Sequence, residues 1–218
     1  MKITIEQIKS NRSIKSYIEK ADESLIALGF TEHSFPHVTR VATYAKKILL
    51  TLGYSEREAE LAEIAGYMHD IGNIINRIDH AQSGAVMAFR ILDKMDADPD
   101  DVATIITAIG NHDEGTAFPV NAVAAAHILA DKTDVRASRV RNTDISSFDI
   151  HDRVNYAVKR SELDVADGEI TLDLDIDISI SPVMDYFEIF LNRMLLCRKA
   201  AEKLGCRFCL KINGQKMI

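Results

Sequence analysis

The sequence lacks any long hydrophobic run, since no apolar stretch approaches the roughly 18 residues that a membrane-spanning helix needs. The amino-terminal stretch "MKITIEQIKSNR" also lacks the apolar segment and the small-residue cleavage site of a secretory signal. Both absences favour a cytoplasmic protein that works without a membrane.

The sequence also lacks an excess of positive charge. It contains 26 lysines and arginines against 33 aspartates and glutamates, for a net charge of −7. Such a chain has no broad cationic footprint for sequence-indifferent binding to nucleic acid, and we expect no nucleic-acid partner. An anionic substrate must then be held locally, by a metal ion or by a few well-placed arginines.

Cysteine is scarce, with only Cys197, Cys206 and Cys209 in the chain. The last two form the stretch "CRFC", a C-x-x-C spacing that can indicate a redox or zinc site. No second pair accompanies it, and the stretch is strand-like, so that residues three apart point to opposite faces. We interpret all three as ordinary reduced cysteines.

What the sequence does contain is a series of amphipathic helical patterns from residue 4 to about residue 130. Each pattern begins at a residue that can cap a helix, and several end at a glycine. The predicted caps are Ser13, Ser34, Ser55 (with Glu58 as a capping box), Asp79, Asp98 and Asn121, and the predicted stops are Gly29, Gly53 and Gly110.

The pattern changes after about residue 145. The stretch "SELDVADGEITLDLDIDISI" alternates apolar and polar residues around Asp167-Gly168, which predicts a β-hairpin. A long amphipathic helix closed by Gly205 and a strand, "CRFCLKI", follow. A chain of 218 residues, 47% hydrophobic and 27% charged, suits one compact domain with a modest appendage. We predict a mainly α fold, with a helical bundle over residues 1–145 and a small β-β-α-β appendage over residues 146–218.

Four polar residues fall where the helical patterns place a buried face. His37 shares a face with core residues, His69 and Asp70 end an apolar helix in "YMHDIGN", and Asp131 lies in the apolar stretch "ILADKTD". A buried carboxylate must be paired, protonated or bound to a metal. Imidazoles with carboxylates suit iron, manganese, zinc or cobalt better than calcium or magnesium. Any one of these histidines can instead be a satisfied core residue, and the spacing alone leaves both interpretations open.

In this order, the four residues resemble the pattern of the HD-domain metal-dependent phosphohydrolases: a lone histidine, a His-Asp pair after an apolar helix, and a distant aspartate. The resemblance covers about residues 30–140. It implies an HD-domain helical bundle in which His37, His69, Asp70 and Asp131 bind a divalent metal. It also implies hydrolysis of a phosphate ester or anhydride by a metal-activated hydroxide.

Two further histidines, His80 in "HAQSGA" and His112 in "NHDEG", make the resemblance closest to a two-metal subgroup that includes the symmetrical bis-nucleoside tetraphosphate hydrolases. In that subgroup such histidines complete a second metal site, and the aspartate of the pair, here Asp70, bridges the two ions. The resemblance therefore implies one or two transition metal ions and a phosphorylated substrate, in particular a nucleotide. The alternative is that His80 and His112 lie at the surface or only support other ligands.

A related subgroup, the cyclic-dinucleotide phosphodiesterases, carries "HDIGK" and a Gly-Tyr-Pro signature. This chain has Asn73 at the position of that lysine. Its stretch "GTAFP", residues 115–119, is only loosely similar to the Gly-Tyr-Pro signature. Those departures count against activity on cyclic dinucleotides.

Basic residues near Asp131 and His37 are candidates for binding the phosphate of the substrate, and Lys132 is the best of them. Lys132 and Asp70 are also the two candidate catalytic residues. The alternative is a solvated basic helix end. The candidates are Lys132, Arg136, Arg139 and Arg141 in "DKTDVRASRVR", and Arg40 one turn after His37.

The remaining titratable residues carry weaker signals. We expect His127, one turn before Asp131, to be a core or supporting residue rather than a ligand. We expect no chemical role for His33, which lies in a predicted loop, or for His151-Asp152, where the helical pattern fails. Asp113 and Glu114 remain candidates for supporting the ligands or transferring protons.

Three functions are consistent with these patterns. The first is a phosphohydrolase, the second is an oxygen-dependent di-iron enzyme of the HD fold, and the third is a non-catalytic nucleotide sensor that signals through its tail. The tail offers an apolar helix and a hairpin edge, which suit either a homodimer interface or a cap on the helical domain.

Overall fold

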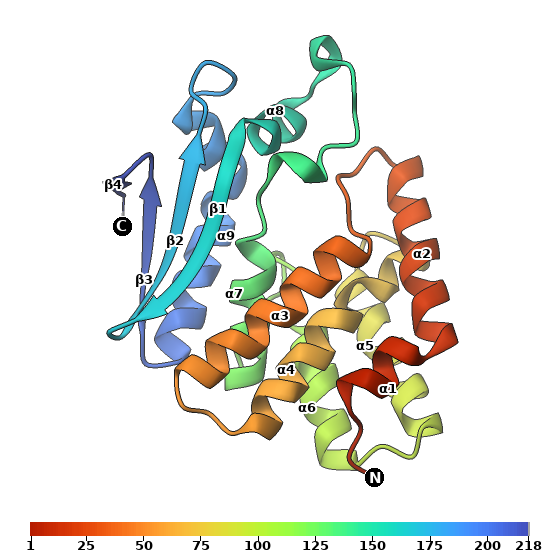
Figure 1. The fold of residues 1–218 in the computed structure, drawn as a ribbon. Coiled ribbons are helices and arrows are strands. Elements are labelled where there is room, and N and C mark those ends of the chain that lie inside the picture. The colour runs from red at the N-terminus through yellow and green to blue at the C-terminus, as the bar shows by residue number, and fades with distance from the viewer. Residues whose placement is uncertain (218) are drawn as a thin grey trace.

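A computed structural model describes residues 1–217 of the chain (Figure 1). Within those residues the fold is mainly α, with a small four-stranded sheet near the carboxyl terminus, as the sequence predicts. The amino-terminal helices are α1 (Ile5–Ser10), α2 (Arg12–Ala27), α3 (Phe35–Thr51), α4 (Glu56–Met68), the 3₁₀ helix η1 (His69–Ile74), α5 (His80–Lys94), α6 (Pro99–Gly110) and α7 (Ala122–Lys132). The carboxy-terminal elements are η2 (Ala137–Arg139), η3 (Ile145–Ser147), α8 (Ile150–Ala157), β1 (Val158–Ala166), β2 (Glu169–Ile176), α9 (Val183–Lys203), β3 (Arg207–Ile212) and β4 (Gln215–Lys216).

Side-chain caps begin several helices where the sequence predicts them. Ser55 and Glu58 form a reciprocal capping box at α4. The side chain of Asp98 accepts a hydrogen bond from the backbone at the start of α6, and that of Asn121 does the same for α7. Ser34 stands at the N-cap position of α3, although its side chain makes no capping hydrogen bond.

Two predicted caps are wrong in detail. Helix α2 begins earlier than predicted, because Asn11, and not Ser13, is the cap: its Oδ1 accepts from the backbone nitrogen of Ser13 at 2.9 Å. Asp79 precedes α5, but its backbone has a φ of 57° and its side chain makes no capping hydrogen bond. This left-handed residue turns the chain into α5 by its backbone alone.

Helix α8 forms where the sequence pattern predicted no helix. Asp149 caps it, with its Oδ1 accepting from the backbone of Asp152 at 2.8 Å, and Val154 and Ala157 are buried. A helix of 8 residues is too short to repeat its apolar pattern, so periodicity could not reveal it.

The carboxy-terminal sheet has the strand order β1-β2-β3-β4. Strands β1 and β2 pair antiparallel across Asp167-Gly168, whose φ angles of 51° and 76° are both positive, as the favoured two-residue hairpin turn requires. Strand β3 pairs parallel with β2 after the crossover helix α9, and a second turn at Asn213-Gly214 leads into β4. The β-β-α-β order is confirmed, with β4 as an additional short strand.

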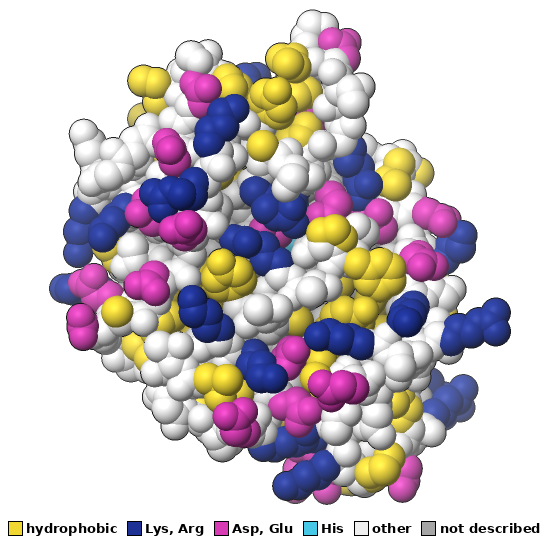
Figure 2. All heavy atoms as spheres, in the orientation of Figure 1, with side chains coloured by type: hydrophobic (Ala, Val, Ile, Leu, Met, Phe, Trp, Pro, Cys, Tyr) yellow, Lys and Arg dark blue, Asp and Glu magenta, His cyan; other side chains and the backbone are white. Residues whose placement is uncertain are grey.

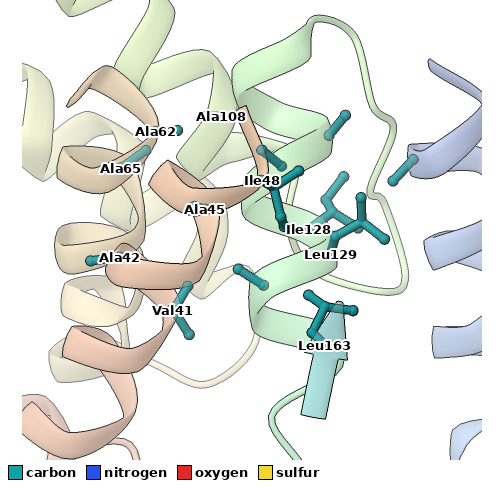
Figure 3. Packing of buried hydrophobic residues seen from close by; sticks show 14 of the residues in the cluster. Val41, Ala42, Ala45, Ile48, Ala62, Ala65, Ala108, Ile128, Leu129 and Leu163 are labelled. Carbon is teal, nitrogen blue, oxygen red and sulfur yellow. The ribbon is translucent and has the colours of Figure 1, made fainter. Parts of the chain in front are cut away.

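The buried apolar residues form a continuous cluster that extends from the helices to the sheet. Figure 3 shows side chains of α3, α4, α6 and α7 packed together, with Leu163 of β1 beside Ile128 and Leu129 of α7. Helices α3 and α4 approach closely, because a Cβ added at Gly66 would lie 2.9 Å from the Cα of Ala42. A division of the chain near residue 145 stays a prediction, and the core crosses that position.

The surface in Figure 2 carries Lys and Arg side chains interspersed with Asp and Glu, rather than gathered into one broad cationic face. None of the helices in the described part of the chain combines the length and the apolar character of a membrane-spanning segment.

Candidate metal centre

Six buried side chains from five segments of the chain converge in one region of the helical bundle. His37 comes from the first turns of α3, His69 and Asp70 from η1 directly after α4, and Asp131 from the end of α7. His80 begins α5, and His112 follows the end of α6. Each of the six is at most 8% exposed. The structure thus brings together all six residues that the sequence proposed as metal ligands.

The ligating atoms lie at short distances from one another. Nε2 of His37 is 3.6 Å from Asp70 Oδ2 and 3.4 Å from Asp131 Oδ1. Nε2 of His69 is 3.1 Å from Asp70 Oδ2 and 3.8 Å from Asp131 Oδ1. On the other side of Asp70, Nε2 of His80 is 3.7 Å from Oδ1 and 3.1 Å from Nε2 of His112.

The second ring nitrogen of each histidine is fixed by a protein acceptor. Nδ1 of His69, His80 and His112 lies 2.8, 3.0 and 2.6 Å from the carbonyl oxygens of Gly66, Arg77 and Ile109, respectively. Nδ1 of His37 lies 2.8 Å from Asp134 Oδ2. A carbonyl accepts only from a protonated Nδ1, so Nε2 is the nitrogen that faces the centre and that carries the lone pair whenever the ring is neutral, which is the usual arrangement of a metal-ligating histidine.

These donors fit a metal ion. Nε2 of His37 and Oδ2 of Asp70 are buried and make no hydrogen bond with any part of the chain between residues 1 and 217. Two ligands bound about 2.1 Å from one ion stand about 3.0 Å apart at a right angle and about 3.4 Å apart in a tetrahedron. The observed separations of 3.1–3.8 Å fall near this range. Buried, unpaired donors at this spacing are costly unless a cation joins them.

The six ligands divide into overlapping sets, each with atoms within 4.8 Å of one another. Asp70 belongs to two of them, because Oδ2 faces His37 and His69 whereas Oδ1 faces His80. A carboxylate shared in this way has the geometry of a bridging ligand. The three sets are His37, His69 and Asp70; His69, His112 and Asp131; and Asp70, His80 and His112.

The pKa shifts of the two aspartates and of two of the histidines also suit a cation, whereas at His69 the effect of burial is outweighed by Asp70, which raises the pKa of that imidazole. Burial opposes the charged form of Asp70, but His69 outweighs it and holds the pKa of Asp70 well below its usual value. Burial likewise opposes the charge of Asp131, and the neighbouring Lys132 lowers its pKa. Burial lowers the pKa of His80 and, further, that of His112, so both imidazoles are neutral and able to bind a metal at neutral pH.

Asp134, which the sequence analysis missed, supports the site from behind His37. Its side chain is fully buried, and besides His37 it pairs with Arg40 Nε at 3.0 Å and Arg136 Nε at 2.8 Å. The only available signal was its position three residues after Asp131. Arg40 and Arg136, which the sequence predicts to bind substrate, both pair with Asp134 through Nε, and neither lines the cavity beside the cluster, so that a contact of either with substrate stays a prediction.

A cavity of about 290 Å³ opens onto the metal ligands. Of the predicted phosphate-binding residues, Lys132 and Arg139 line it; Lys132 Nζ lies 2.8 Å from Asp131 Oδ2. His33 and His151, for which we expected no chemical role, also lie in its wall, as do Arg77 and Arg193, which the sequence analysis did not single out. Arg141 instead pairs with Asp22.

His127 is fully buried and packs against two histidines of the cluster, as expected for a core or supporting residue. Its ring centroid is 5.0 Å from that of His69 and 5.2 Å from that of His112, and burial lowers its pKa to about 3. Oε1 of Glu114 lies 3.8 Å from Nζ of Lys132, which lines the cavity.

Comparison with known proteins matches residues 35–153, more than half of the chain, to the HD domain family, and this segment contains all six ligands. An uncharacterized protein of Methanocaldococcus jannaschii, MJ1020, is 23% identical over 211 residues, which cover 86% of this chain and 80% of that protein. A predicted HD superfamily hydrolase from an uncultured Thermotogales bacterium, known from a crystal structure, is similar with a TM-score of 0.45 and 26% identity. That similarity covers 58% of this chain and 68% of the other.

Proposed function

The chain belongs to the HD domain family, and from that premise we propose that it is a metal-dependent phosphohydrolase that cleaves a phosphate ester or anhydride, in particular of a nucleotide. The observation that carries this proposal is the buried cluster of six ligands, with the two oxygens of Asp70 turned toward different histidines. We propose that it holds two divalent transition metal ions, and the imidazole-rich set favours iron, manganese, zinc or cobalt.

In this proposal, one set of residues binds the metal ions and another set binds the substrate. His37, His69, Asp70 and Asp131 would hold one ion, and His80, His112 and Asp70 the other. When bound, such ions lower the pKa of a water molecule and offset charge on the phosphoryl oxygens.

Lysine and arginine side chains that line the cavity would contact the substrate. Lys132 is 6% exposed, its ammonium lies beside Asp131, and the cavity reaches it, so that it is placed to donate hydrogen bonds to a phosphate near the ligands. Arg77 and Arg139 line the same cavity. The walls leave room for a small molecule, which suits a nucleotide or another compact phosphate compound.

Elemental analysis of the purified protein and a panel of nucleotides with resolved products test this proposal. We expect about two transition metal ions per chain, from the shared-carboxylate arrangement, and release of phosphate or a nucleotide. Replacing Asp70 by Ala should remove the metal and abolish turnover together, since both sets that contain Asp70 lose an oxygen ligand. Asp164→Ala, a change of an exposed carboxylate on β1, is the matched control and should retain both.

Turnover that survives in the Asp70→Ala variant would contradict the proposal. Oxygen consumption by the iron-loaded protein, without release of phosphate, would replace the hydrolase by a di-iron oxygenase. Binding of nucleotide without any product would favour the sensor.

A further inference from the structure

We propose that Arg193, on α9 near the carboxyl end of the chain, binds the phosphate group of the substrate together with Lys132. This inference rests on the proposed phosphohydrolase function and names a second cation for the same substrate. It gives the carboxy-terminal appendage a direct part in the site.

Helix α9 brings Arg193 to the cavity from outside the segment that matches the family. The match ends at residue 153, whereas α9 spans Val183–Lys203 and packs against α7, the helix that carries Asp131 and Lys132. Arg193 therefore lines the same cavity as Asp131 and Lys132, on a wall that the family segment does not supply.

The guanidinium of Arg193 is held in place on one edge and one face. Its Nε forms an ion pair with a carboxylate oxygen of Glu114, although the contact lacks the geometry of a hydrogen bond, and the same oxygen lies 3.8 Å from Nζ of Lys132, so Glu114 links the two cations. Its central carbon lies 4.5 Å from the ring centroid of Phe190, which is only 1% exposed and therefore fixed in the core. A guanidinium restrained in this way loses little conformational entropy when it binds an anion.

The terminal nitrogens of Arg193 remain available. Neither donates a hydrogen bond to an acceptor in residues 1–217, where the contact of Arg193 is through Nε. Arg139 is more fully engaged, because it donates to the carbonyls of Glu32 and Asp134, whereas Arg77 uses one terminal nitrogen, which donates to Asn73 Oδ1. A free guanidinium fork next to an ammonium matches the oxygens of a phosphate, which accept several charge-assisted hydrogen bonds at once.

The test compares three variants of the metal-loaded full-length protein. Arg193→Ala removes the proposed contact, Arg193→Lys keeps the charge without the fork, and Arg198→Ala removes an exposed arginine from the same helix as a matched control. The first readout is binding of inorganic phosphate by calorimetry. The second is the KM and kcat for p-nitrophenyl phosphate, with metal content and thermal midpoint measured in parallel.

We expect Arg193→Ala to weaken phosphate binding and raise KM by about tenfold or more, the usual loss when a hydrogen bond to a charged group is removed. Arg193→Lys should recover part of this loss, Arg198→Ala should match the wild type, and all variants should keep their metal and their thermal midpoint.

Unchanged phosphate binding in Arg193→Ala would overturn the inference, as would a loss of binding that accompanies lost metal or a lowered midpoint. Wild-type protein that binds no phosphate would also overturn it. If the wild type binds phosphate through Arg193 but hydrolyses no phosphate compound, the proposed function fails while the binding role of Arg193 stands.

Discussion

At the scale of the residue, His37 differs from the other histidines of the cluster in what its Nδ1 meets. His69, His80 and His112 face neutral carbonyls, whereas His37 faces the carboxylate of Asp134. A carboxylate behind an imidazole fixes its orientation and makes Nε2 a stronger electron donor to a metal. The burial of Asp134 opposes its charge, but His37 and the arginines around it keep its pKa low, so that it remains a carboxylate.

Asp134→Asn should therefore weaken metal binding without removing a ligand. The amide has nearly the shape of the carboxylate but lacks its charge, and loss of such a supporting partner typically costs about 10- to 100-fold in metal affinity. The measurement is a competition titration of the metal against a chelator of known affinity. Asp152→Asn, at an acid that lines the cavity without pairing with a histidine of the cluster, should bind metal as the wild type does. Equal affinities for the two variants would show that Asp134 has no such role.

The sequence predicts which residues meet in the buried cluster better than it predicts where the side chains around the cluster point. His37, His69 and Asp131 each interrupt an apolar helical face, a periodic signal that by itself left a core role open, and the resemblance to the HD-domain pattern implied that they are ligands. Arg40 and Arg136 stand near ligands in the sequence, but their long side chains turn to Asp134 instead of the cavity, and neighbours in sequence do not fix that direction. Arg193 lies far along the chain, so only the packing of α9 on α7 could place it.

At the scale of the element, the contact of η1 with α5 sets the distance between the His69-Asp70 pair and His80. A Cβ added at Gly72 would lie 2.0 Å from the carbonyl oxygen of His80 and 2.5 Å from the backbone nitrogen of Gly84. The two segments thus touch backbone to backbone, which only glycine permits at this position. The small residues of "HAQSGA" serve this close approach.

Gly72→Ala should push α5 away from η1 and displace His80. Because the clashing atoms are backbone and cannot rotate away, we expect a loss of at least about 2 kcal/mol in the free energy of unfolding, as for an overpacked core. We also expect a lower metal content, measured by elemental analysis beside urea unfolding. Gly110→Ala is the control, since its added Cβ would make only an ordinary 3.5 Å contact with Ala85. Wild-type stability and metal content in Gly72→Ala would refute this account.

Elements with local signals were predictable, and those held by tertiary packing were not. The capping box of Ser55 and the hairpin turn at Asp167-Gly168 rest on a few adjacent residues, and both form as predicted. Helix α8 and strand β4 are too short for periodicity.

At the scale of the whole molecule, the proposed metal ligands lie on helices that are distant in the sequence. They come from α3, η1, α5, α7 and the end of α6, so that bound ions would cross-link most of the helical bundle. The same core continues through α7 into α9 and the sheet. Because the unfolded chain cannot gather these ligands, the free energy of metal binding is also free energy of folding.

Removal of metal should consequently lower the stability of the entire protein. At a free metal concentration one hundred times the dissociation constant, binding adds about 2.7 kcal/mol, which corresponds to roughly 5–11 °C in the thermal midpoint of a chain of this size. Calorimetry before and after chelation measures this shift, and one transition in each scan is expected because the core is continuous. In Asp70→Ala, which lacks the shared ligand, chelation should leave the midpoint almost unchanged. A wild-type midpoint insensitive to chelation, in protein shown to have carried metal, would mean that the ions bind without cross-linking the helices.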